Sequence, residues 1–321
     1  MKKILLLLTL ALCLTFLRSN AQYNSYKSEL GFRSDNDSYL AQGQDRYYTN
    51  GLFVKYRSAI DQSAIKNPKL NKIIWELESG QKMFNPQTGS IMNPDFIDRP
   101  FAAYLYVGGA INFLYNSEGN LKLKMQIGTI GPSAKGKEAQ EFLHNTFGFY
   151  EIDGWQWQVN NELGINSSLE FQKLIGRLGS QKTDFSVSSY LNAGNTFAGA
   201  GAGILFRTGA INPLHSSAST QSVVSNNSKS KVEKEFFFYA KPMLHFIAYD
   251  ATIKGGMFRN EKGPVVFDAK PLVFSQQAGA IFSRNRWTAD FSVIFKSREI
   301  KSSAKPHQYG SMALFYRLNK E

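Results

Sequence analysis

Residues 121–144 read LKLKMQIGTIGPSAKGKEAQEFLH, and this stretch contains the two patterns that decide the fold. In its first part, apolar side chains alternate with polar ones at Leu121, Leu123, Met125 and Ile127. This alternation predicts a strand, and Gly131-Pro132 ends it, because proline cannot donate to a ladder and glycine tolerates unusual dihedral angles. From 134 to 147 the apolar spacing becomes helical, so we predict a strand followed by a short helix in a loop.

Two polar residues of the predicted helix, Gln140 and His144, are four positions apart and therefore share one helix face. Histidine can act as a general base near neutral pH, so a Gln/His pair in a loop after a strand fits a hydrolytic site. The alternative is that His144 only caps or packs the helix, because polar pairs at this spacing are common in helices.

Alternating segments of similar length recur along the chain. The strands that we predict are 24–34, 50–60, 71–79, 101–114, 120–130, 161–175, 183–194, 197–208, 234–249, 271–283, 286–297 and 307–318. Aromatic residues make up 14% of the chain, and no apolar run beyond residue 21 could form a membrane-spanning helix. The even strand count and this composition predict an all-β transmembrane antiparallel up-and-down β-barrel of about 12 strands, with a short helix in an extracellular loop. A soluble secreted β-sandwich is the alternative.

The N-terminus has the features of a secretory signal peptide. A charged start and an apolar run at 4–17 precede a small-residue cleavage site, so we expect a signal peptide at 1–21 and an outer-membrane barrel domain at 22–321. The only cysteine, Cys13, would leave with that peptide, so the mature chain would have no disulfide or thiolate metal site. The formal charge would fall from +12 to about +9, which favours anionic lipid head groups over nucleic acid as partners.

If the N-terminus lies on the inner side of the membrane, the strand order predicts on which side each connection lies. The connections expected on the exterior are 35–49, 80–100, 131–160, 195–196, 250–270 and 298–306. Residues 209–233 fall on the inner side, are rich in Ser and Asn and have no periodic pattern, which indicates a long, mobile turn. The run AGAGAG at 198–203 indicates either close approach of another element to the barrel wall or a tight corner.

Two of the exterior connections contain polar motifs. The first has SDNDS at 34–38 and QDRYYT at 44–49, whose carboxylate and amide oxygens are suitable hard ligands for Ca²⁺. An Asx-rich turn without a metal is the alternative, because Asn and Asp favour turns and no EF-hand calcium loop is present. The second closes with DRPF at 98–101, where a salt bridge at the start of a strand is the simplest interpretation.

Together these motifs resemble the lipid A 3′-O-deacylase family of outer-membrane enzymes. In the first two connections the resemblance is carried by Asn36, Asp37, Asp45, Arg46, Tyr48, Thr49 and the DRPF motif. In the third it is carried by IGP at 130–132, Gly136, Gln140, His144, Gly148, Trp155 and Gln156. Each motif alone is weak, whereas the three together are specific.

The resemblance implies an active site at the outer end of the barrel, between the barrel wall and a loop helix. It implies that His144 is the general base that activates water, and that Gln140 and Thr49 complete the site and orient substrate. It further implies that Asn36 and Asp37 hold a Ca²⁺ ion. The substrate would be lipid A of lipopolysaccharide, from which an ester-linked acyl chain is removed at the exterior of the outer membrane.

The chain departs from the family pattern at two places. An acidic residue expected just after the helix falls by gapless count on Tyr150, with Glu151 one position later. A basic residue expected in the second exterior connection has no match there, and Lys82 lies earlier in a different context.

The predicted mechanism is direct attack of water, with Ca²⁺ stabilising the oxyanion. A serine-nucleophile esterase is disfavoured because no G-x-S-x-G motif occurs. The alternative function is a non-enzymatic barrel, either porin-like or surface-binding. A porin would line its lumen with charge, and the predicted strands offer few candidates for a strong selectivity ring. The sequence leaves the oligomeric state open.

Overall fold

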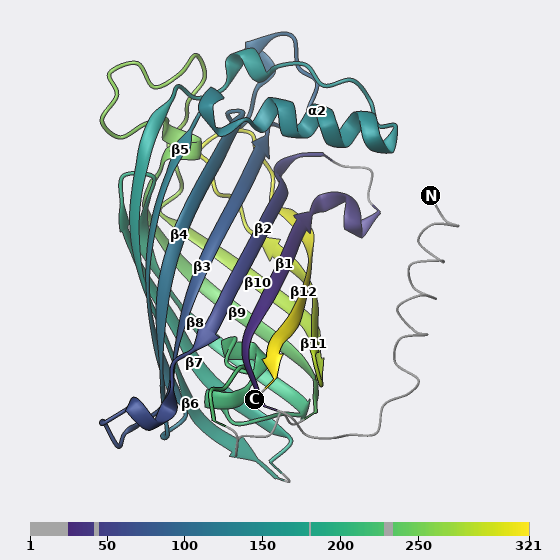
Figure 1. Cartoon of the computed structure of the whole chain (residues 1–321). Helices are drawn as coiled ribbons and strands as arrows, with labels where there is room; N and C mark the ends of the chain where they lie inside the picture. The colour runs from purple at the N-terminus through teal and green to yellow at the C-terminus, as the bar shows by residue number, and fades with distance from the viewer. Residues whose placement is uncertain (1–24, 42–44, 180, 228–233, 321) are drawn as a thin grey trace.

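The chain forms one closed antiparallel barrel of twelve strands, seen in a computed structural model that describes residues 25–41, 45–179, 181–227 and 234–320 (Figure 1). The strands are β1 Tyr26–Asn36, β2 Tyr47–Ala59, β3 Leu70–Asn85, β4 Ala102–Tyr115, β5 Gly119–Ile130, β6 Glu162–Leu178, β7 Thr183–Gly194, β8 Phe197–Ala210, β9 Glu235–Asp250, β10 Leu272–Arg284, β11 Trp287–Lys296 and β12 His307–Lys320. Each predicted strand corresponds to one observed strand, so the predicted barrel is confirmed. The predicted signal peptide at 1–21 lies outside the described residues.

Neighbours in sequence are neighbours in the sheet, and β1 pairs with β12 to close the barrel. The main differences from the predicted bounds lie at the ends of β2 and β3. Thr49 belongs to β2, and β3 continues to Asn85, so the first two connections are shorter than expected. Their polar motifs therefore begin on strand ends, which hold side chains more firmly than loops do.

The strands expose apolar residues and bury charged ones, which is the reverse of a soluble core. On β5, Leu123, Met125 and Ile127 are exposed, whereas Lys122 and Lys124 line the lumen. This pattern is that of a barrel whose outer surface meets lipid. The expectation of few charged lumen residues is wrong, because the positions between the apolar ones face inward, and on β5 two of these positions are lysines.

Residues 211–227, which we call the plug, close the barrel at the end away from α2. Arg207 of β8 donates to Ser217 Oγ at 2.8 Å, and Lys72 of β3 donates to the Ser222 carbonyl at 2.8 Å. The prediction of a mobile turn is wrong over 211–227, because its hydroxyl and backbone groups bind buried charges of strands on nearly opposite sides of the barrel. Residues 228–233 of that predicted turn lie outside the described residues.

Loops cross the mouth of the barrel at the other end, and we call residues 98–101, 251–254 and 300–305 the roof. Arg99 is buried and donates to Thr252 Oγ1 of α3 (Ala251–Lys254) at 2.9 Å. The carbonyl of Asp98 accepts from Ser302 Oγ at 2.6 Å. Within the described parts of the chain neither Asp98 nor Arg99 forms an ion pair, so the predicted salt bridge is wrong and the DRPF motif instead joins three loops.

The predicted helix is present as α2 (Gly136–Phe147) and packs on the ends of β3 and β4. Its apolar contacts are Met83, Ala103 and Trp155, all of them buried. A Cβ at Gly136 would lie 2.5 Å from the Cβ of Ala103 and 2.5 Å from the Trp155 ring, so glycine is required for this close approach. None of the helices in the described residues has the length and apolar character needed to span a bilayer.

Candidate functional site

A cavity of about 180 Å³, which we call the site cavity, lies between α2 and the adjoining ends of β1 and β2. The residues that line it are Asn36, Asp37, Ser38, Asp45, Thr49, Asn50, Met83, Gln140, Leu143, His144, Phe149 and Tyr150. The structure therefore brings together all five residues predicted to act in catalysis or metal binding. Their individual roles stay predictions.

His144 lies on the inward face of α2 and is 8% exposed. Its Nδ1 is 2.7 Å from the carbonyl oxygen of Tyr150, and because a carbonyl can only accept, Nδ1 carries the hydrogen. In the neutral ring, Nε2 is therefore the basic atom, and it lies 3.3 Å from Asp45 Oδ2. The fold thus fixes which ring nitrogen could take a proton from water.

Electrostatics favour protonation of His144. Burial alone would lower the pKa of the imidazole, but the hydrogen bonds to Asp45 and to the Tyr150 carbonyl outweigh burial. The negative charges of Asp45 and Asp37 act in the same direction, so the pKa of His144 is raised above its ordinary value. Such perturbed groups are concentrated at functional sites.

Asp45 connects the parts of the site, and the sequence analysis did not select it as a site residue. Its Oδ1 accepts from Thr49 Oγ1 and from Asn85 Nδ2, the latter at 3.0 Å. Its Oδ2 accepts from Gln140 Nε2 at 3.0 Å and from the Tyr150 hydroxyl. Burial would raise the pKa of Asp45, but its hydrogen bonds to His144, Thr49 and Tyr150 lower it. The available signal was a carboxylate four residues before Thr49 within one motif.

Asp37 supplies a second carboxylate to the same wall. It begins the 3-10 turn η1 (Asp37–Leu40), and its Oδ2 accepts from the Arg46 backbone amide at 2.9 Å. Burial and the charge of Asp45 raise the pKa of Asp37 to about 8. None of the residues lining the site cavity is a lysine or arginine, so His144 is the one basic side chain among the lining residues that can offset the two carboxylates.

The oxygen atoms around the site cavity fit a hard cation such as Ca²⁺. Asp37, Asp45 and Thr49 contribute oxygen atoms to the lining of the cavity. The buried Asn50 Oδ1 adds another, and it has no hydrogen-bond partner among the described residues. Asn36 Oδ1 accepts from the Ser38 amide at 2.7 Å, which leaves it one free lone pair. The described residues contain no group of three His, Cys, Asp or Glu that could hold a metal, so a cation here would also need amide, hydroxyl and water oxygens.

Gln140 is 3% exposed, and both ends of its amide bond to protein groups. Its Oε1 accepts from Trp155 Nε1 at 2.7 Å, and its Nε2 donates to Asp45 at 3.0 Å. We interpret Gln140 as a positioning residue that ties α2 to the carboxylate beneath it.

The structure also places the residues at which the chain departs from the family pattern. Tyr150 lines the site cavity, and its hydroxyl bonds Asp45 and the Gly89 amide, the latter at 3.0 Å. Glu151 is exposed and does not line the cavity. Lys82 lines the barrel lumen instead of the site cavity. Of the two positions between which the resemblance left the acid open, only Tyr150 lines the site cavity.

Comparison with known families decides the identity of this barrel. The sequence model of the family described as "Outer membrane protein LpxR" matches residues 6–318. This chain belongs to the LpxR family. As a member with a closed twelve-stranded barrel, it is located in the outer membrane. Among proteins with curated functions, none is similar enough in sequence to match the chain.

One solved structure gives the same fold for this LpxR-family chain, and other barrels align less well. LpxR from Salmonella typhimurium aligns with a TM-score of 0.71 at 18% identity, covering 90% of this chain and 100% of that chain. The beta domain of the Bordetella autotransporter BrkA aligns with a TM-score of 0.48 at 8% identity, covering 92% and 100%. The COG4313 outer membrane channel from Pseudomonas putida F1 aligns with a TM-score of 0.45 at 9% identity, covering 94% and 100%.

Proposed function

We propose that this protein is an outer-membrane esterase that removes an ester-linked 3′-acyloxyacyl chain from lipid A of lipopolysaccharide. Membership of the LpxR family supports the class of enzyme. The observation that carries the proposal is the fixed tautomer of His144, whose basic Nε2 faces an oxygen-rich cavity beside Asp45.

The residues of the site cavity suit water attack on an ester. Nε2 of His144 takes a proton from the water whose oxygen attacks the ester carbonyl, and Asp45 stabilises the imidazolium that forms. Nε2 then returns the proton to the leaving alkoxide, so the products are the free fatty acid and a sugar hydroxyl. A Ca²⁺ ion held by Asp37, Asn36 and neighbouring oxygens would supply a Lewis acid for the oxyanion.

The walls of the site cavity also suit a substrate that is half polar and half acyl. Met83, Leu143 and Phe149 line the cavity beside the carboxylates. Phe142 on α2 is 69% exposed, and such an apolar side chain is suited to contact with lipid. An ester at the boundary between sugar and acyl chain would place its carbonyl near His144 and its chain near these residues.

We assign the α2 end of the barrel to the cell exterior. The longer connections follow β3, β5 and β9 at this end, whereas four of the five connections at the other end are short. Outer-membrane barrels place short turns in the periplasm and longer loops outside. The active site would then face the leaflet that contains lipopolysaccharide.

Mass spectrometry of lipid A tests the proposed function directly. Cells that make the protein should contain lipid A lighter by one acyloxyacyl unit than the lipid A of cells without it. Cells that make the His144→Ala variant at equal outer-membrane level should contain the heavier form. Unchanged lipid A in the presence of the wild-type protein, assayed with added Ca²⁺, would overturn the proposal.

The structure favours the esterase over the porin alternative. The plug is hydrogen-bonded to strands at one end of the lumen, and loops of the roof are hydrogen-bonded to each other at the other end, so we expect no wide path for solute. Recordings in planar bilayers should therefore show no large stable channel. A surface-binding barrel without hydrolysis would predict unchanged lipid A in the experiment above.

A further inference from the structure

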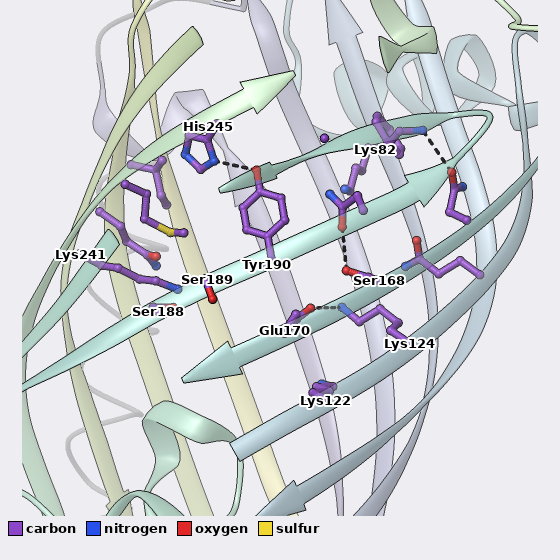
Figure 2. Close-up of a pocket in the computed structure, with 18 of the residues that line it drawn as sticks. Lys82, Lys122, Lys124, Ser168, Glu170, Ser188, Ser189, Tyr190, Lys241 and His245 are labelled. Atoms are coloured by element: carbon purple, nitrogen blue, oxygen red, sulfur yellow. Dashed lines mark hydrogen bonds and ion pairs between the residues drawn. The ribbon is translucent and has the colours of Figure 1, made fainter. Parts of the chain in front are cut away.

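The barrel lumen forms a cavity of about 660 Å³ that shares no lining residue with the site cavity. Figure 2 shows bonded pairs on its wall, such as Lys124 with Glu170 and Tyr190 with His245. The second pair meets across β8 at Gly201, where a Cβ would lie 2.3 Å from the Tyr190 ring, in line with the close approach predicted for the AGAGAG run. This pairing contrasts with one amide of the site cavity.

Asn50 of β2 lines the site cavity with an amide that has no protein partner. The side chain is 6% exposed, its Oδ1 is buried and unpaired, and its Nδ2 also has no hydrogen-bond partner among the described residues. Burying an amide without a partner costs free energy, so such a group in a cavity wall indicates a ligand that supplies the missing bonds.

A β-bulge aims Asn50 into the site cavity. The pairing of β2 with β3 shifts between Tyr48 and Asn50, so Thr49 is an extra residue in β2. Tyr48 lines the lumen, whereas Thr49 and Asn50 both line the site cavity. Bulges of this kind are common beside active sites, where they re-aim a side chain.

Asn50 also stands at the end of a row of β2 residues that faces lipid. Lys55 lines the lumen, so the alternating positions Val54, Leu52 and Asn50 face outward, and Val54 is 50% exposed. An acyl chain that lies along Val54 and Leu52 would place the ester carbonyl at its head beside Asn50.

Other side-chain donors of the site cavity are already in use. Thr49 Oγ1, Gln140 Nε2 and the Tyr150 hydroxyl all donate to Asp45, the Gln140 bond being 3.0 Å long. Asn50 Nδ2 is thus a buried donor that remains free for an oxygen atom of the substrate.

We propose that Asn50 is a catalytic residue whose Nδ2 donates a hydrogen bond to the ester carbonyl oxygen and to the oxyanion that forms when water attacks. A donor held in place by a strand stabilises the developing charge more than it stabilises the uncharged ester. The other end of the amide, Oδ1, stays available to the cation. The inference rests on the proposed esterase function and adds to it a residue that the sequence analysis did not select.

Asn50→Asp is the decisive variant, because it keeps an oxygen atom at this position and removes the N–H donor. With lipid A in micelles and added Ca²⁺, its kcat should fall roughly 10²–10³-fold with little change in KM. Asn50→Leu should lose at least as much. The controls Asn260→Asp and Asn260→Leu change an exposed asparagine between β9 and β10 and should retain activity. A near-native kcat in Asn50→Asp, or a change confined to KM, would overturn the inference.

A binding measurement separates this inference from the proposed function. Butyl methylphosphonate has a tetrahedral phosphorus in place of the attacked carbon and so mimics the oxyanion. Calorimetric titration of the full mature protein in micelles with Ca²⁺ should show binding to the wild type that weakens at least about tenfold in both Asn50→Asp and Asn50→Leu. The affinity of Asn50→Asp for Ca²⁺ should not fall.

The two measurements have distinguishable failures. Phosphonate binding that depends on Asn50, in a wild type that leaves lipid A unchanged, would support the oxyanion donor and overturn only the proposed substrate. No phosphonate binding to the wild type, or equal affinity in the two variants, would overturn the role of Asn50 even if lipid A is deacylated.

Discussion

The site cavity and the barrel lumen lie in one molecule but differ in how their charged side chains are balanced. The site cavity has two carboxylates and a histidine, and none of its lining residues is a lysine or arginine. Of the seven lysine and arginine side chains that line the lumen, five pair with a carboxylate. A buried charge is costly unless something offsets it, and within the lumen the protein itself supplies most of the offsetting charge. The carboxylate and amide oxygens of the site cavity instead fit a cation.

The two regions also differ in what holds their side chains. Lumen residues stand on the strands of a closed sheet, where the register fixes every position. The site cavity combines strand ends with a helix that depends on Gly136 and Trp155 for its placement. Substitutions in the loop and helix of the site cavity should therefore change activity with little effect on the folding of the barrel, whereas substitutions of lumen residues change the sheet itself.

The largest expected effect is the loss of activity in His144→Ala. If Nε2 of His144 is the general base, deacylation should fall by roughly 10²–10⁴-fold. His144→Gln should be little better, because an amide cannot accept the proton. Turnover of purified lipid A in micelles, with heat-modifiable gel mobility as the test of folding, measures this.

The control for that variant is His215→Ala, which changes a histidine of the plug and should retain activity. Near-native turnover in His144→Ala would show that the catalytic assignment is wrong. A variant that does not fold would instead support the interpretation that His144 only packs the helix.

The next largest effect concerns the cation of the site cavity. A chelator should abolish deacylation, and added Ca²⁺ should restore it. Asp37→Asn removes one of two carboxylates, so the Ca²⁺ concentration for half-maximal activity should rise by about tenfold or more, since affinity follows ligand charge. Full activity in excess chelator, or an unaltered Ca²⁺ requirement in Asp37→Asn, would remove the ion from the mechanism.

A smaller effect of opposite sign is expected at Tyr150, where the family pattern has an acid. Tyr150→Glu adds a carboxylate to the site cavity and should lower the Ca²⁺ concentration for half-maximal activity a few-fold, by the same charge argument. Glu151→Gln is the matched control, because Glu151 is exposed and outside the cavity. A Ca²⁺ requirement that changes in Glu151→Gln and not in Tyr150→Glu would reverse our assignment of these two positions.

Local patterns in the sequence were sufficient for the barrel and for part of the site. Alternation predicted all twelve strands, and the change to helical spacing after Gly131-Pro132 predicted α2. The role of Asp45 was not predicted, because its partner Asn85 comes from the end of β3 and its partners Gln140 and Tyr150 from the connection between β5 and β6. Sequence spacing describes one element at a time, whereas these contacts arise only after the barrel has closed.

The plug was mispredicted for a related physical reason. A Ser-rich segment without periodicity usually lacks apolar surface to bury and stays mobile. Here the segment is held by polar contacts with buried strand charges, such as Glu235 Oε1, which accepts from Ser217 Oγ at 2.6 Å. Those partners lie between 10 and 150 residues away in sequence, so no local pattern reveals them.

The smallest expected effect, and the most direct test of the electrostatics, is the titration of His144. Its raised pKa means that the imidazole stays protonated to a pH above the ordinary value of about 6.5. Because the neutral ring is the base, activity should be lost as the pH falls through this raised value. Asp45→Asn removes the hydrogen bond and charge that raise the pKa and leaves burial, which lowers it. The pKa should therefore move to lower pH in this variant, as measured by histidine NMR of Ca²⁺-free protein with His144→Gln as the assignment control. A pKa that stays the same or rises in Asp45→Asn would show that Asp45 does not set the protonation of His144, and the difference in charge balance between the site cavity and the lumen would then lose its functional meaning.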